Sequence, residues 1–160
     1  MRVMDVMSTP ARTVTPADTA SAAWEQMRLH RIRHLVVVQQ SQILGVLSAT
    51  DLGGPHGDSV RSGRLVADLM SDHVVRATPE TTVREVANLM RGHVIDCLPI
   101  VKGRTLAGVV TSLDLLDLIG RGADRPVATA ERRVLKARGN TPRAQVKARL
   151  TGGATRRTRR

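Results

Sequence analysis

The sequence predicts a mixed α/β (α+β) protein built from two copies of one β-α-β-β-α unit, with a basic extension at its C-terminus. Residues 3–52 repeat as residues 66–115 at a constant offset of 63, without a gap, and 17 of the 50 paired positions are identical. Self-similarity at a fixed offset marks a duplicated structural unit. Each copy also contains two continuous apolar runs of strand length. A seam between the copies is therefore the first place to expect a ligand.

The composition suits one compact domain with an aliphatic core. Hydrophobic residues make up 41% of the 160-residue chain, and Trp24 is its only Phe, Tyr or Trp residue. Folds that stack nucleic-acid bases on several exposed aromatic side chains are therefore excluded. The chain has no apolar run of the ~18 residues that a membrane span needs, and no signal-peptide stretch at its N-terminus. With a single cysteine and no internal disulfide, we expect a cytoplasmic protein without membrane association.

The net charge of +11 is divided unevenly along the chain. Residues 1–122 hold 13 of the 25 Lys and Arg residues and 12 of the 14 Asp and Glu residues, a net charge of +1. Residues 123–160 hold the remaining 12 basic and 2 acidic residues, a net charge of +10. We therefore expect repeat 1 at residues 1–60, repeat 2 at 61–122 and a basic tail at 123–160 that is partly helical or disordered.

Each repeat is expected to begin with a short apolar-spaced segment, at residues 3–7 and 66–70. A brief strand ends in Thr-Pro, because proline keeps the preceding residue extended; its two copies are residues 13–16 and 76–79. A helix follows, and its candidate capping residues are Asp18 or Thr19 and Thr81 or Thr82. Glu85 stands three residues after Thr82, which is the capping-box spacing.

Two buried strands are expected next in each repeat, because their apolar runs are continuous. They cover residues 35–38 and 43–47, and residues 98–101 and 106–110. Asp51 and Asp114 would open or cap a last helix, which is longer in repeat 2 and runs through residues 113–119. The Gly- and Pro-rich stretch 53–58 is a loop that joins the copies.

The motif that closes each repeat, Gly-x-x-Ser/Thr-x-x-Asp, carries the chemistry. A glycine within a strand indicates close approach by another group. The hydroxyl and the carboxylate three residues later project toward one spot beside a helix N-terminus, which favours anions. This arrangement suits a nucleoside phosphate, although the carboxylate could instead simply cap its helix. The two copies of the motif contain Gly45, Ser48 and Asp51, and Gly108, Thr111 and Asp114.

In order and spacing, these elements resemble the CBS domain, and two in tandem resemble a pseudo-twofold Bateman module. The opening motif is DVMS at 5–8 and DLMS at 68–71. The strand motif is HLVVV at 34–38 and CLPIV at 97–101, and the closing motif is GVLSATD at 45–51 and GVVTSLD at 108–114. The resemblance covers about three quarters of the chain, and three motifs in order, twice, make it specific.

The resemblance implies a regulatory module that binds an adenosine-containing nucleotide, AMP, ADP or ATP, in the seam, with no required cofactor. Asp51 and Asp114 would contact ribose. Ser48 and Thr111 would lie near phosphate. The adenine slot would be lined by Thr13, Thr15, Leu35, Arg76, Thr78, Leu98 and Pro99. Related modules associate through their helices, so a homodimer is implied as well.

The two repeats differ in the charge of the residues at the positions where a phosphate would interact. Repeat 1 has Arg33 and His34 before its buried strand, and repeat 2 has Asp96 and Cys97 at the matching positions. In related modules basic residues at these positions contact phosphates, so the resemblance makes Arg33 and His34 candidates to neutralise phosphates, whereas Asp96 would repel them. This difference predicts one competent anionic site and one weak, empty or nucleoside-only site. The alternative is a solvated basic face. Repeat 1 also has Val36 in place of the motif proline.

The histidine and cysteine residues of the chain give weaker indications of a functional site. His30 and His93 are equivalent but have no acidic or cysteine neighbours in sequence, so we expect no metal site. Cys97 adjoins a buried strand and is expected to be a core residue. No arrangement typical of a nucleophile or a general acid–base pair is recognisable, and we expect no enzymatic activity.

The tail could form two short basic helices, at residues 130–138 and 141–150. Arg-rich segments bind phosphate backbones by counterion release, so RNA, the ribosome or DNA is a possible partner, and a solubilising extension is the alternative. A competing reading is a non-sensing structural protein that acts only through this tail. The candidate polyanion-binding residues are Arg132, Arg133, Lys136, Arg138, Arg143, Lys147, Arg149, Arg156, Arg157, Arg159 and Arg160.

Overall fold

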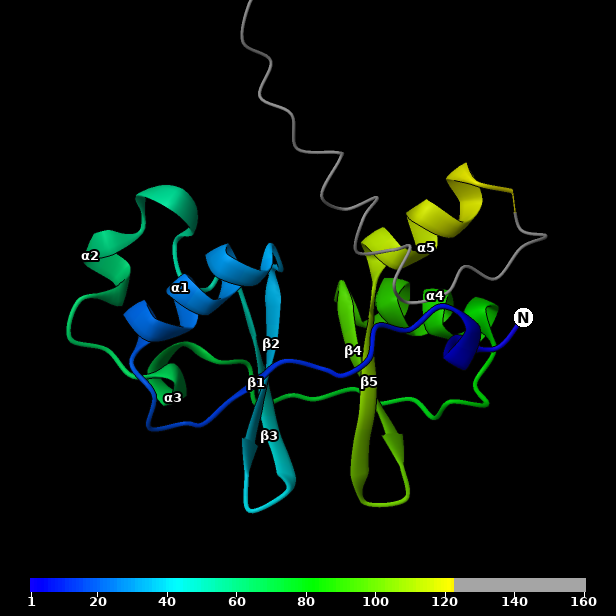
Figure 1. Ribbon diagram of the computed structural model, residues 1–160, viewed down its shortest axis with the longest axis horizontal. Coiled ribbons are helices and arrows are strands. Elements are labelled where there is room, and N and C mark those ends of the chain that lie inside the picture. The colour runs from blue at the N-terminus through cyan, green and yellow to red at the C-terminus, as the bar shows by residue number, and fades with distance from the viewer. Residues whose placement is uncertain (123–160) are drawn as a thin grey trace, which may run out of the picture.

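The computed structural model describes residues 1–122, which form two halves placed side by side, with the strands in the middle and the helices on the outer flanks (Figure 1). The mixed α+β class predicted from the sequence is confirmed. The elements in chain order are η1 (Val3–Asp5), β1 (Thr13–Val14), α1 (Ala20–His30), β2 (His34–Gln39), β3 (Gln42–Ser48), η2 (Gly54–His56), α2 (Asp58–Arg61), α3 (Val66–Leu69), α4 (Val83–His93), β4 (Cys97–Lys102), β5 (Thr105–Thr111) and α5 (Ser112–Gly120).

The two sheets share an antiparallel hairpin and differ at their third strand. Strands β2 and β3 pair in the first half, and β4 and β5 in the second. In the first half the Val36 N–H donates to the Arg12 carbonyl at 3.0 Å, and β1 pairs in parallel with β2. Pro99 occupies the matching position in β4 and has no N–H to donate. The strand expected at 76–79 is accordingly reduced to a single parallel bridge between Ala77 and Ile100.

The long helices begin at the threonines predicted as their caps. The Thr19 side chain accepts the Ala22 N–H, and the Thr82 side chain accepts the Glu85 N–H. The capping box predicted for α4 is present, because the Glu85 carboxylate accepts the Thr82 N–H at 2.8 Å. Such caps satisfy backbone donors that the first turn of a helix leaves unpaired.

The opening segment of each repeat crosses to the other half. Val3 and Val6 are buried in the second core, whereas Val66 is buried in the first. Backbone hydrogen bonds fix both crossings: the Ser8 N–H donates to the Val109 carbonyl at 2.8 Å, and the Ser71 N–H donates to the Val46 carbonyl at 2.9 Å. Neither core is therefore complete without a segment from the other repeat.

The last helix expected after Asp51 does not form, and this prediction is wrong for repeat 1. Residues 49–53 are turns, followed by η2 and α2. Gly53 and Gly54 have φ values of 76° and 63°, which the interior of a right-handed α-helix does not allow. The buried Arg61 guanidinium holds this loop, donating to the carbonyls of Leu52 and Gly54 at 2.8 and 2.7 Å. In repeat 2, α5 forms as predicted.

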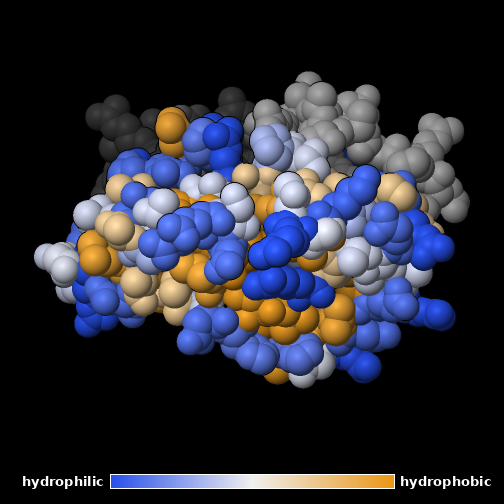
Figure 2. Space-filling model, turned by 90° about the horizontal axis from the view of Figure 1, so that it is seen from below, coloured by the Kyte–Doolittle hydropathy of each residue, from blue (hydrophilic) through white to orange (hydrophobic). Residues whose placement is uncertain are grey.

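The hairpin turns lie at one end of the molecule. Seen from that end, apolar surface gathers in the middle of the face and hydrophilic side chains cross it (Figure 2). The closing motifs lie at the opposite ends of β3 and β5, so this apolar surface is separate from them. Within residues 1–122, no helix is long and apolar enough to cross a membrane.

Candidate functional site

The hydroxyl and the carboxylate of each closing motif are bonded to one another. Asp51 Oδ2 accepts the Ser48 N–H at 2.8 Å and the Ser48 hydroxyl at 2.7 Å. Asp114 Oδ2 accepts the N–H and hydroxyl of Thr111 at the same two distances. The motif therefore places the same hydroxyl–carboxylate pair at the end of β3 and at the end of β5.

The surroundings of the two carboxylates differ because only one repeat continues as a helix. Thr111 is the N-cap of α5, and Asp114 completes its capping box and is 5% exposed. Asp51 lies in a turn and is exposed. The helix-capping alternative thus applies to Asp114 and not to Asp51, which holds its hydroxyl without a helix to cap.

The glycines of the closing motif are explained by the crossing segments. A Cβ atom on Gly45 would lie 2.7 Å from the backbone oxygen of Ser71, and one on Gly108 would lie 2.8 Å from that of Ser8. The close approach inferred from the sequence is therefore real, but the approaching group is the chain itself. These glycines position the two repeats and carry no argument for a ligand.

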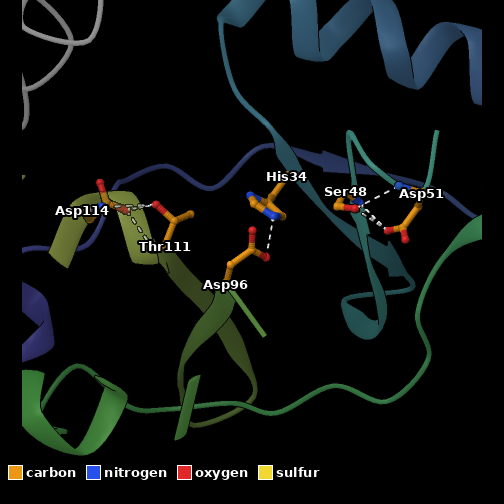
Figure 3. Close-up of polar contacts among 6 residues, drawn as sticks. All are labelled: His34, Ser48, Asp51, Asp96, Thr111 and Asp114. Carbon is orange, nitrogen blue, oxygen red and sulfur yellow. Dashed lines mark hydrogen bonds and ion pairs between the residues drawn. The ribbon is translucent and has the colours of Figure 1, made fainter. Parts of the chain in front are cut away.

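A polar contact joins the two repeats between the closing motifs. His34 Nε2 lies 2.9 Å from Asp96 Oδ1, and their side chains are 9% and 64% exposed. Figure 3 shows this contact between the Ser48–Asp51 and Thr111–Asp114 pairs. His34 is the register partner of Ser48 in the β2–β3 hairpin, and the Asp96 carbonyl accepts the Ser112 N–H at 2.9 Å beside the second pair.

Arg33 is not brought together with His34. It lines a groove of about 270 Å³ with Trp24, Met27 and Thr50, between α1 and the loop that follows β3. Arg33 lies in the bend before β2, whereas His34 is the first residue of that strand. The structure thus places His34 at the contact between the repeats and Arg33 on the helix side of the first half.

The residues expected to line the adenine slot fall into two groups. Leu35 and Leu98 are fully buried within the two cores, against the helices, and do not face the seam. Pro99 is also buried, within β4. The others are exposed and have backbone or side-chain contacts: Thr13 pairs with Val36, the Thr15 N–H donates to Asp18, the Thr78 N–H donates to Thr81, and Arg76 Nη2 donates to the Ile43 carbonyl at 2.9 Å.

Comparison with known proteins decides the family. The model of the CBS domain matches residues 3–52 and 66–121. The chain belongs to the CBS domain family. It is 32% identical over 114 residues to the CBS domain-containing protein YhcV of Bacillus subtilis, covering 71% of this chain and 81% of that protein.

Solved CBS structures share the fold. The CBS domain pair of protein MJ0100, in complex with 5′-methylthioadenosine and S-adenosyl-L-methionine, is 25% identical with a TM-score of 0.69, covering 76% of this chain and 97% of that one. The CBS domain of a CBS domain-containing membrane protein from Sphaerobacter thermophilus is 27% identical with a TM-score of 0.63, covering 74% and 87%. The resemblance stated from the motifs is confirmed.

Cys97 of the second CBS repeat is buried, as its place beside a strand predicted. Burial raises the pKa of its thiol far above the usual range, and the Asp96 and Asp114 carboxylates raise it further. Such a thiol stays protonated and unreactive. Among residues 1–122, no three His, Cys, Asp or Glu side chains are grouped to hold a metal ion. The predictions for the basic tail fall on residues 123–160, which lie outside the described residues.

Proposed function

We propose that this CBS pair is a regulatory module that binds an adenosine-containing ligand in the seam between its repeats. The observation that carries the proposal is the doubled hydroxyl–carboxylate pair, Ser48 with Asp51 and Thr111 with Asp114. The CBS pair of MJ0100, which binds two adenosine derivatives, supports the ligand class. The family model that matches this chain is that of the CBS domain, whose pairs are regulatory modules.

The chemistry of the pair fits a ribose. A carboxylate offers about four acceptor sites. Asp51 can therefore keep the bonds to Ser48 and still accept hydrogen bonds from two adjacent ribose hydroxyls. Because the hydroxyl and N–H of Ser48 already hold this carboxylate in one orientation, a ligand would find the acceptor preorganised. Asp114 repeats the arrangement at a less exposed position. The ligand class includes AMP, ADP and ATP as well as unphosphorylated adenosine derivatives.

A thermal-shift screen on the full chain tests the proposal. Adenosine, AMP, ADP, ATP and 5′-methylthioadenosine would each be compared with the guanosine counterpart at millimolar concentration. A ligand that binds only the folded state at 100 times its Kd stabilises by about 2.7 kcal/mol, which moves the Tm by several degrees. We expect shifts for the adenosine series only. An unchanged Tm with every adenosine compound would contradict the proposal.

We further propose that the chain forms a homodimer through α5 and that the tail binds a polyanion. Helix α5 packs Leu115 and Leu118 inward, yet Leu113, Leu116 and Ile119 are exposed on its outer side. A helix that is apolar on both sides is normally covered on both. For the tail, the supporting observation is its 12 basic and 2 acidic residues.

A further inference from the structure

Among residues 1–122, the charged side chains identified at the closing-motif end of the seam are mostly acidic. Asp51, Asp96 and Asp114 all lie at or beside strand ends there. His34 is at this end too, and its imidazole contacts Asp96. Arg33, the other basic residue that the sequence suggested for a phosphate, lines the groove beside Trp24 instead. The pKa of the buried Cys97 thiol, raised in part by Asp96 and Asp114, responds to this negative charge.

The contact of Asp96 with His34 places an anion where a ligand phosphate would bind. His34 is the register partner of Ser48, the hydroxyl expected near the phosphate end of a ligand. Asp96 reaches this imidazole from the other repeat, 62 positions along the chain, and its Oδ1 lies 2.9 Å from Nε2. A carboxylate oxygen at this distance makes the same hydrogen bond that a phosphate oxygen would make.

We propose that Asp96 makes the seam selective for adenosine derivatives without a 5′-phosphate, because it occupies His34 and adds a carboxylate beside the ligand's 5′ end. A phosphate must displace Asp96 from the imidazole and then remain near that displaced carboxylate, and both effects disfavour it. A neutral 5′ substituent leaves the contact intact, and a cationic one is attracted by the surrounding carboxylates. This inference rests on the proposed function and narrows its ligand class.

The selectivity is local to one exposed carboxylate, so it can be removed without disturbing the core. Asp96 is 64% exposed in its side chain, and its structural hydrogen bond to the Ser112 N–H comes from its backbone carbonyl. Asp96→Asn keeps that carbonyl and the size of the side chain while removing the negative charge. Glu25→Gln is the matched control, since it removes one exposed carboxylate from the outer face of α1, where Glu25 pairs with Arg28.

Calorimetric titration of the full chain with adenosine and with AMP tests the inference, because the two ligands differ only in the 5′-phosphate. We expect wild type and Glu25→Gln to bind adenosine more tightly than AMP. Asp96→Asn should strengthen AMP binding by about tenfold, the scale of one charge-assisted contact, and leave adenosine binding unchanged. Adding His34→Asn to Asp96→Asn should cancel the gain for AMP alone.

Two results would overturn the inference while leaving the proposed function standing. One is a wild-type protein that binds AMP as tightly as adenosine. The other is an Asp96→Asn protein in which the affinities for both ligands change by the same factor. If neither ligand binds wild type or Asp96→Asn, the proposed function fails, and the inference fails with it.

Discussion

Gly45 and Gly108 show how single residues hold the two repeats together. Each lies where the backbone of a crossing segment passes over a strand, at a separation that excludes a side chain. Replacing Gly45 by alanine forces its Cβ against the Ser71 carbonyl, and we expect a loss of about 1–3 kcal/mol in the free energy of unfolding, the usual cost of overpacking. Urea denaturation measures this loss.

Gly92→Ala is the matched control for Gly45→Ala. Gly92 lies within α4, and a Cβ there meets nothing within 4 Å. This variant should gain up to about 1 kcal/mol, because alanine favours a helix. A Gly45→Ala protein as stable as wild type would contradict the crossing of residue 71 over β3.

The two long helices begin with different caps: the cap of α1 is neutral, and the cap of α4 includes a charged carboxylate. The pKa of Glu85 is lowered because its carboxylate accepts hydrogen bonds from the Thr82 side chain and backbone. A lowered folded-state pKa gives stability that is present above the ordinary glutamate pKa and is lost as the pH falls through the folded value. We therefore expect the destabilisation caused by Glu85→Gln to shrink between pH 7 and pH 3.

Thr19→Ala provides the comparison at the start of α1, where Ala22 stands in place of Glu85 and no carboxylate takes part. This variant should lose about 1 kcal/mol at both pH values in urea denaturation. A loss in Glu85→Gln that is equally independent of pH would contradict the capping box as a charged interaction.

Helix α5 is the element that the homodimer proposal concerns. Leu116→Glu places a charge in the middle of its outer apolar side, and because that side is exposed within the chain, the fold should be unaffected. We expect analytical ultracentrifugation to show a dimer for wild type and a monomer for Leu116→Glu. Ser59→Glu, at an exposed position on α2, is the control and should remain dimeric. A monomeric wild type, or a dimeric Leu116→Glu, would argue against this interface.

Local signals predicted most elements, and long-range contacts set the rest. The caps at Thr19 and Thr82 and the two hairpins follow from residues a few positions apart. The crossing of the opening segments could not be predicted, because Val3 and Val66 are identical and either fits either core. The absence of a helix after Asp51 is explained by Gly53 and Gly54, whose positive φ values override the capping signal of Asp51.

In the candidate site, too, the features that depend on nearby residues were predicted, and the feature that depends on long-range packing was missed. Both hydroxyl–carboxylate pairs were predicted, because each motif places its two members three residues apart. The contact of His34 with Asp96 was missed, since the offset of 63 aligns Asp96 with Arg33 and suggests a difference between sites rather than a bond across the seam. Only the packing of the two repeats brings these side chains together.

At the scale of the whole molecule, the nearly neutral repeats and the basic tail should act separately. Full-length protein is expected to bind RNA or DNA with a steep salt dependence, because several phosphates would be neutralised at once. Truncation after Gly122 should abolish this binding and leave adenosine binding unchanged. Filter binding of both proteins across a salt series checks the prediction, and a truncated protein that still binds nucleic acid would refute it.

In the proposed function, the two carboxylates of the closing motifs hold a ligand in the seam. Calorimetry with adenosine on wild type, on the double variant Asp51→Asn/Asp114→Asn and on Asp68→Asn tests it directly. Asp68 is the matched control, because its carboxylate also accepts a backbone N–H, that of Leu65 at 2.8 Å, beside a short helix. We expect adenosine to bind wild type and Asp68→Asn, and to bind the double variant at least tenfold more weakly. Equal affinity in all three proteins, or no heat with wild type, would contradict it.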